Sequence, residues 1–124
     1  MKISFRIIGS AVSFSATTPA MVAETVRLVN LFQAHLVLIH VGIKDAAKET
    51  AMQSLIETTQ LNHDRVKVFW AEGDPADQIL KICQKEKVDL LVAGALKKEN
   101  LVNHYLGTVA RKIMRKATCS IWMI

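Results

Sequence analysis

Apolar and polar positions follow two different periods along this chain. Short runs rich in β-branched and apolar residues predict five strands, at 3–12, 36–41, 65–70, 89–93 and 120–124. Between them, apolar residues recur every three or four positions and predict four helices, at 19–33, 45–61, 75–86 and 108–116. Because strands alternate with helices throughout, the pattern predicts an α/β protein whose parallel sheet carries helices on both faces.

Capping residues set the expected helix starts. Thr18 before Pro19 predicts one N-cap, and Asp45 and Asp74 predict two more, with Pro75 at the first helical position of the third helix. The apolar stripes predict the inward-facing helix residues, which are Met21, Val22, Val26, Val29, Phe32, Ala47, Met52, Leu55, Ile56, Thr59, Ile79, Leu80, Cys83, Val109, Ile113 and Met114.

Two loops rich in small residues follow strands at one expected edge of the sheet. They are Ser13–Thr18 and Gly94–Gly107. The second has about fourteen residues without a regular period, whereas ordinary connections have about 4–6. A glycine after a strand and another before a helix let backbone amides approach an anion. Because ligands of parallel sheets bind at the carboxyl ends of the strands, we expect a ligand site between these loops.

Length and composition narrow the class of protein. The 124 residues fit one domain, taken as 1–124, and 51% of them are hydrophobic. No apolar run approaches the ~20 residues of a membrane span, so no membrane partner is expected. The first apolar run is interrupted by Arg6 and is interpreted as a strand rather than a signal peptide. Two cysteines, Cys83 and Cys119, indicate a reduced, cytoplasmic protein rather than a disulfide framework.

The positive charge is concentrated near the C-terminal end. Residues 1–93 carry ten basic and ten acidic side chains, so the net charge of +5 comes from 94–124. This excess favours an anionic partner near the long loop. The alternative is a solvated helix face, since basic residues also gather in the last turns of helices, here at Arg111, Lys112, Arg115 and Lys116.

Several common site motifs are absent from the sequence. Neither the phosphate-loop pattern G-x-x-x-x-G-K-[ST] nor G-x-G-x-x-G after the first strand is present. Ser13 and Gly94 stand where a receiver domain needs acidic residues. No Ser-His-Asp or Cys-His set and no metal site can be proposed from spacing, so no catalytic or metal-binding residue is expected. His40 lies inside an apolar strand and is interpreted as a core residue.

One pattern remains in the long loop: Gly94, two residues, Lys97, nine residues, then Gly107-Thr108. It resembles the G-x2-G-x9-G-[S/T] nucleotide loop of the universal stress protein family, with lysine at the second glycine. Ser13-Phe14-Ser15 resembles the family's Asp-x-Ser turn, and 36–41 its second strand. The segments 73–80, 88–94 and 117–120 resemble further family motifs, so the resemblance spans nearly the whole chain outside the second helix.

The resemblance implies a three-layer open sandwich with a five-stranded parallel sheet of order 3-2-1-4-5, of the adenine-nucleotide α-hydrolase-like type. It implies ATP or ADP as ligand, with Mg expected only together with nucleotide. The residues implied in nucleotide binding are Ala11, Val12, Ser13, Val41, Gly94, Lys97, Gly107, Thr108 and Val109. It also implies a homodimer that pairs its last strands, through Ser120, Ile121, Trp122, Met123 and Ile124. No nucleic-acid partner is expected.

Two residues depart from the family pattern. Ser13 replaces the acidic residue that accepts hydrogen bonds from ribose hydroxyls, and Lys97 replaces a glycine. If that position needs a positive φ, lysine costs about 1 kcal/mol, and its Cβ hinders phosphate approach. Alternatively, the Lys97 ammonium binds phosphate itself.

Three functions follow from these observations. The first is a regulatory module of the stress response that binds an adenine nucleotide or another phosphorylated ligand, with at most slow ATP hydrolysis. The second is a nucleotide-free member of the family that acts as a dimeric interaction scaffold, which Ser13 and Lys97 favour. The third is an enzyme of the related α-hydrolase-like group, for which the sequence offers no acidic or metal-binding cluster.

Overall fold

The computed structural model describes residues 4–94, 96–97, 105–106 and 108–124, and within 96–97 and 105–106 it describes the backbone alone. Its main sheet is parallel and has the order β3-β2-β1-β4-β7. The strands are β1 (Ile7–Ala11), β2 (His35–Val41), β3 (Val66–Ala71), β4 (Leu90–Ala93) and β7 (Ser120–Met123). The predicted order 3-2-1-4-5 is confirmed, since β7 is the fifth strand of this sheet.

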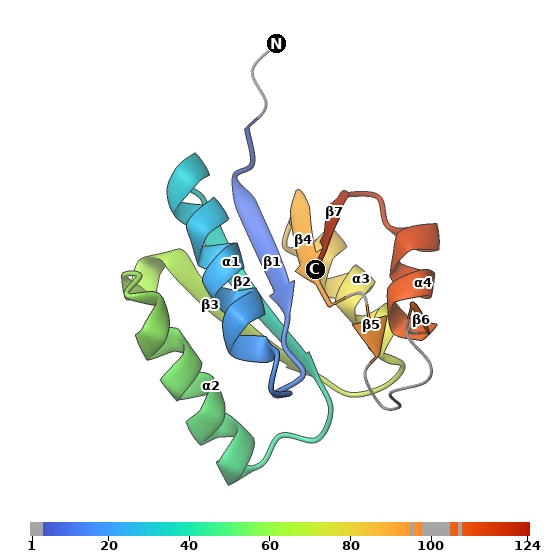
Figure 1. The fold of residues 1–124 in the computed structure, drawn as a ribbon, viewed down its shortest axis with the longest axis horizontal. Coiled ribbons are helices and arrows are strands. Elements are labelled where there is room, and N and C mark those ends of the chain that lie inside the picture. The colour runs from blue at the N-terminus through green and yellow to red at the C-terminus, as the bar shows by residue number, and fades with distance from the viewer. Residues whose placement is uncertain (1–3, 95, 98–104, 107) are drawn as a thin grey trace.

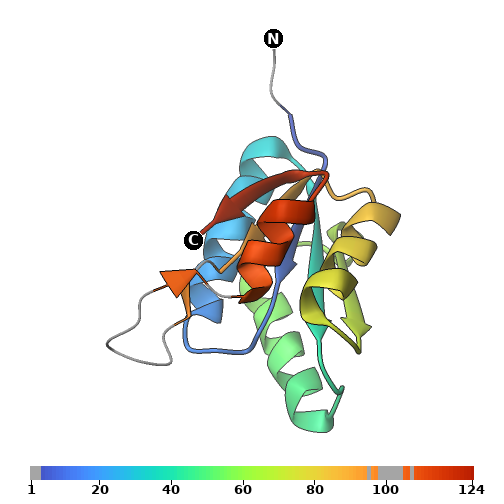
Figure 2. The same cartoon turned by 90° about the vertical axis from the view of Figure 1, so that its right-hand side faces the viewer.

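Helices cover both faces of the sheet (Figures 1 and 2). On one face lie α1 (Thr18–Phe32) and α2 (Ala46–Thr59), and on the other lie α3 (Pro75–Lys85) and α4 (Thr108–Lys116). A short 3-10 helix, η1 (His63–Arg65), precedes β3. Within the described part of the chain, no helix is both long and apolar enough to cross a bilayer.

Strand β2 shows why both faces need helices. Leu36 and Leu38 are fully buried beneath α1 and α2, while Val37 and Ile39 are buried beneath α3 and α4. Successive side chains of a strand point to opposite faces, so an unbroken apolar run is stable only where both faces are covered.

Strand β1 is shorter than the predicted 3–12. It begins at Ile7, because the residues before it make other contacts. The Arg6 amide donates to the Asp89 carboxylate (2.9 Å), and the Phe5 ring packs edge-on against Phe32, with 5.1 Å between ring centroids. At the other end, the Val12 amide still donates to the Ile39 carbonyl oxygen (2.7 Å), so the backbone pairing extends one residue past Ala11.

The N-caps agree with prediction at two helices of three. The Asp45 carboxylate accepts the Lys48 amide (2.8 Å), and the Asp74 carboxylate accepts the Asp77 amide (3.0 Å). The prediction for Thr18 is wrong, because helix α1 already begins there. Its side chain is buried and its hydroxyl accepts the Ser15 amide (3.0 Å), so it stabilises the preceding turn instead.

Three of the predicted inward-facing helix residues are exposed. In α4 the buried side chains are Ala110 and Ile113, and this stripe leaves Val109 39% and Met114 54% exposed on either side of it. In α2 the buried residues begin at Met52, so Ala47 in the first turn is exposed. Ala110 is small and buried between these two larger exposed residues, which a stripe of large apolar residues does not reveal.

The long loop contains a short antiparallel pair that its sequence did not predict. Strand β5 (Leu96–Lys97) pairs with β6 (Tyr105–Leu106), with Lys97 opposite Tyr105. Two-residue strands are too short to leave a visible period of two in the sequence. The Gly107 prediction lies outside the described residues.

Strands β1 and β4 are neighbours, and the chain leaves them toward opposite faces. Ser10 of β1 is in register with Val92 of β4. After β1 the chain enters α1 on one face, while after β4 it passes through β5 and β6 to α4 on the other (Figure 1). The two strands therefore flank the topological switch point of the sheet, where ligands of open α/β sheets bind.

Candidate functional site

Hydroxyl groups close the turn between β1 and α1. The Ser13 hydroxyl donates to the Ser15 hydroxyl (3.2 Å), which also lies 3.0 Å from the Thr17 hydroxyl oxygen. The Thr18 amide donates to the Ser15 carbonyl oxygen (3.1 Å). Val12 is buried and Ser13 is exposed, so the chain passes from core to surface between these two predicted site residues. The turn is thus fixed by its own small polar side chains.

An aromatic cluster supports the same turn from beneath. Phe14 has a left-handed backbone, with φ 58°, which is unfavourable for a bulky residue. Its ring packs on His40, with 4.7 Å between centroids, and stacks near Trp70 at 6.2 Å. The Lys44 ammonium lies 5.5 Å from the centre of the Trp70 ring. These contacts offset the strained backbone, so the position of Phe14 is set by packing rather than by local preference.

His40 connects the aromatic cluster to β1. Its Nδ1 donates to the Val12 carbonyl oxygen (2.7 Å), because a carbonyl can only accept. Its Nε2 is buried and has no hydrogen-bond partner among the described residues. The interpretation of His40 as a core residue is confirmed, but its role is more specific than packing: it ties the end of β1 to the end of β2.

Strand β2 ends at the predicted base-pocket residue, Val41, and the next residue must be glycine. Gly42 has φ 153°, and a Cβ at this position would lie 2.9 Å from His40 Nε2. Its amide donates to the Ala71 carbonyl oxygen at the end of β3 (2.8 Å). The backbone around half-buried Val41 is therefore held firmly in the sheet.

Gly94, which follows β4, differs from Gly42 because no atom of the described residues requires it to be a glycine. A Cβ at Gly94 would meet no atom within 4 Å among the described residues, and its φ lies outside the left-handed region. The residue is exposed at the carboxyl end of the sheet. None of the described side chains therefore fills the space beside this backbone.

Lys97 takes the extended conformation of a strand in β5. The condition of a positive φ is therefore not met at Lys97. Hindrance of phosphate approach by its Cβ and phosphate binding by its ammonium both stay predictions. Helix α4 then begins at Thr108, which is exposed together with Val109. Free amides of a helix N-terminus favour anions, so these two residues are placed where a phosphate is stabilised.

Part of the positive charge of α4 is neutralised by α3. The Lys112 ammonium lies 3.0 Å from Asp74 Oδ2 and 3.0 Å from Asp77 Oδ1. The Asp77 amide and the Lys112 ammonium lower the pKa of the Asp74 carboxyl, and the two carboxylates raise the pKa of Lys112. Lys112 therefore joins two helices, and the charge available to an anionic ligand is smaller than the sequence indicates.

Five of the nine predicted nucleotide residues lie at one edge of the sheet. Ala11 ends β1 and is followed by Val12 and Ser13, Val41 ends β2, and Gly94 follows β4, with β1 paired between β2 and β4. A surface hollow of about 690 Å³ lies between α1 and α2 and reaches Phe14 and Ser15 of the β1 turn, whereas another of about 580 Å³ lies elsewhere, beside α3 and β7. No group of three or more His, Cys, Asp or Glu suited to a metal was found within the described ranges.

The sequence did not reveal the role of His40, because its hydrogen-bond partner, Val12, is distant in sequence and follows another strand.

Comparison with known proteins decides the family. The model of the universal stress protein family matches residues 4–124. This chain belongs to the universal stress protein family. The resemblance deduced from the Gly94–Thr108 pattern is confirmed, although the match does not test the role of any single residue in that pattern.

Two curated members of the family are similar to parts of the chain. A universal stress protein of Methanothermobacter thermautotrophicus is 44% identical over 54 residues, which are 43% of this chain and 36% of that protein. One of Methanocaldococcus jannaschii is 27% identical over 85 residues, which are 66% of this chain and 50% of that protein. The matches thus span about a third and a half of these relatives.

Solved structures of family members share the fold over almost the whole chain. A universal stress protein in complex with cAMP has a TM-score of 0.81 at 14% identity, covering 98% of both chains. One from Archaeoglobus fulgidus, in complex with dAMP, has a TM-score of 0.71 at 18% identity, covering 99% of both chains. The fold is therefore the adenine-nucleotide α-hydrolase-like fold.

Proposed function

We propose that this universal stress protein is a cytoplasmic regulatory module of the stress response that binds an adenine nucleotide at the switch point of its sheet. The base and ribose lie against the ends of β1 and β2, near Val12 and Val41. The phosphates lie beside the Gly94 backbone and the start of α4. Two free thiols, Cys83 and Cys119, support a reducing compartment.

The proposal rests on Gly94, beside which none of the described residues fills the space. Gly42 is explained by its backbone angle and by the nearby His40 ring, but none of the described residues gives such an explanation for Gly94. A glycine that these residues do not require, at the carboxyl end of a switch-point strand, suits close approach of a ligand to the backbone. The cAMP and dAMP complexes of structural neighbours support adenine and phosphate as the chemistry of that ligand.

Isothermal titration with ATP, ADP, AMP and cAMP tests the proposal. We expect saturable heat with at least one of them and none with adenosine, because the phosphate supplies the contact with the glycine loop. Phosphate release in the ATP sample should be slow or absent, since Ser13 leaves the β1 turn without a carboxylate. No heat with any nucleotide at millimolar concentration would contradict nucleotide binding and favour the scaffold function.

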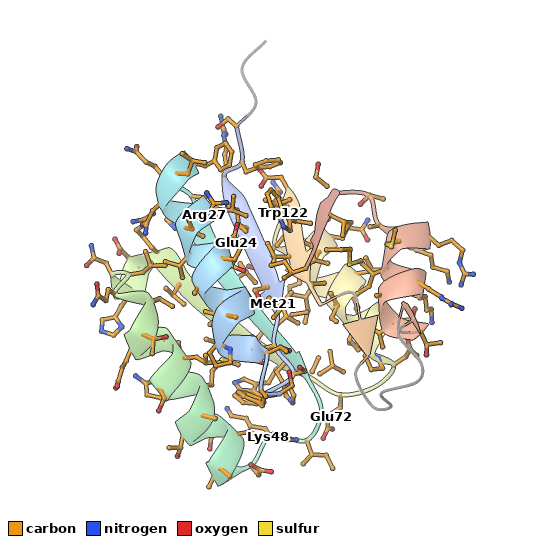
Figure 3. The ribbon with its side chains drawn as sticks, viewed as in Figure 1. Met21, Glu24, Arg27, Lys48, Glu72 and Trp122 are labelled. Carbon is orange, nitrogen blue, oxygen red and sulfur yellow. The ribbon has the colours of Figure 1, made fainter. Side chains whose placement is uncertain are left out.

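We further propose a homodimer formed through β7. This strand ends the sheet, and Trp122 and Ile124 are 42% and 47% exposed. Trp122 is in register with Val92, so it points to the face that carries α1; Figure 3 labels it with the α1 residues Met21, Glu24 and Arg27. An exposed apolar edge strand is stabilised by a second copy.

Sedimentation velocity measures this association. We expect a concentration-dependent dimer in the wild type and a weaker dimer in Trp122→Glu. Met114→Glu is the matched control, because Met114 is equally apolar and 54% exposed, but on α4. A wild-type protein that stays monomeric at every concentration, or equal effects of the two substitutions, would overturn pairing through β7.

A further inference from the structure

The two cysteines lie together on the α3 and α4 side of the sheet, far from the proposed nucleotide site. Cys83 is on the inner face of α3 and only 4% exposed, while Cys119 comes just before β7 and is half-buried. Both belong to the same apolar cluster, and both line the surface hollow of about 580 Å³. The hollow gives solvent access to the less buried thiol.

Backbone hydrogen bonds hold the two cysteines in the same neighbourhood. The Val88 amide donates to the Cys83 carbonyl oxygen (2.9 Å), which fixes the turn after α3. The Ser120 amide donates to the carbonyl oxygen of Asp89, the next residue along that turn (3.2 Å). The end of α3 and the start of β7 are therefore hydrogen-bonded to the same short segment, and this places the two cysteines near each other.

The two thiols have different chemical environments. The neighbouring Cys83 thiol stabilises a thiolate on Cys119 and lowers the pKa of Cys119 to about 7. The same interaction, together with burial, raises the pKa of Cys83. The charged groups that line the hollow are Asp77, Lys81, Lys87, Asp89 and Lys116, and of these the Asp89 carboxylate opposes the lowered pKa of Cys119. A thiolate on the more exposed sulfur, beside a protonated buried thiol, is the arrangement of an attacking and a resolving cysteine.

We propose that Cys119 and Cys83 form a peroxide-reactive dithiol site. The Cys119 thiolate attacks one oxygen of hydrogen peroxide and becomes a sulfenic acid, while the O–O bond breaks and hydroxide leaves. The Cys83 sulfur then attacks the sulfenic sulfur; a disulfide forms and the oxygen leaves as water. In total, two thiols and one peroxide give one disulfide and two waters, so that peroxide is the two-electron oxidant.

Peroxide treatment of the native protein, followed by intact mass and thiol counting, tests this site. The wild type should lose two hydrogens and both free thiols without forming a dimer on a non-reducing gel. Cys83→Ser should stop at the sulfenic acid, which dimedone traps on Cys119. Cys119→Ser should leave Cys83 unreacted, because Cys83 is buried and protonated. Circular dichroism of both variants verifies that they fold.

A pH profile provides a second readout that does not depend on disulfide formation. Alkylation of Cys119 by iodoacetamide in native Cys83→Ala should reach its half-maximal rate at a higher pH than in the wild type, because alanine cannot donate a hydrogen bond to the Cys119 thiolate. Retention of both thiols under excess peroxide would overturn the proposal. So would oxidation of Cys83 before Cys119, or a disulfide that joins two chains instead of one.

Discussion

Replacement of Gly94 by valine should weaken adenine-nucleotide binding by about tenfold or more, equivalent to about 1.4 kcal/mol, while the stability of the fold stays unchanged. The valine side chain enters space that no described protein atom occupies, so the free protein accommodates it. In the nucleotide complex the same space is expected to hold the phosphates. Titration with ADP measures the affinity, and urea denaturation measures the free energy of unfolding.

Gly9→Ala is the matched control for this substitution. A Cβ at Gly9 would lie 3.2 Å from Val88 Cγ1, inside the sheet and away from the nucleotide. Overpacking of this kind costs about 1–3 kcal/mol of unfolding free energy. We expect Gly9→Ala to be less stable but to bind ADP normally once folded. Normal ADP binding by Gly94→Val would show that the nucleotide does not approach this backbone.

His40→Leu should lower the free energy of unfolding by about 1–3 kcal/mol, because it leaves a buried carbonyl without a donor. The carbonyl belongs to Val12, which is 4% exposed and accepts the Nδ1 hydrogen at 2.7 Å. Leucine fills a similar volume, so the hydrogen bond is the main loss. Urea denaturation at neutral pH measures the change.

His35→Leu is the control for His40→Leu, since His35 lies on the same strand with an exposed side chain. It should change the unfolding free energy by less than about 0.5 kcal/mol, as is usual for surface positions. Because His40 also supports Phe14 and the β1 turn, His40→Leu should weaken ADP binding as well. Equal stability of the two variants would contradict the role given to His40.

The order and type of the main elements could be predicted because they are fixed by long, regular patterns. The run at 36–41 is apolar without interruption, which only a strand covered on both faces explains, and β2 has that position. Asp45 and Asp74 cap their helices as predicted, since a cap depends on residues three positions apart. The alternation of strands with helices then predicts a parallel sheet that is covered by helices on both faces.

Very short strands and the exact buried positions of a helix could not be predicted from the sequence. Strands β5 and β6 have two residues each, and their pairing depends on a tertiary contact rather than on a pattern. In α4, Ala110 is buried where the larger Val109 was expected. Hydrophobicity alone does not distinguish the centre of an apolar stripe from its edges.

The contacts that shape the site connect positions distant in sequence. His40 reaches Val12 across 28 positions, and Lys112 reaches Asp74 across 38. Without a sheet order, no spacing rule brings these residues together. The family resemblance provided that order, and it placed Ala11, Val12, Ser13, Val41 and Gly94 on one edge, but it did not indicate what holds them there.

A crystal structure of the protein grown with ADP tests the central proposal most directly. We predict electron density for the adenine against the ends of β1 and β2, and for the phosphates beside the Gly94 amide and the first turn of α4. Density for ADP elsewhere, for example in the hollow beside α3 and β7, would contradict the proposed site. An empty switch point at millimolar ADP would contradict nucleotide binding itself.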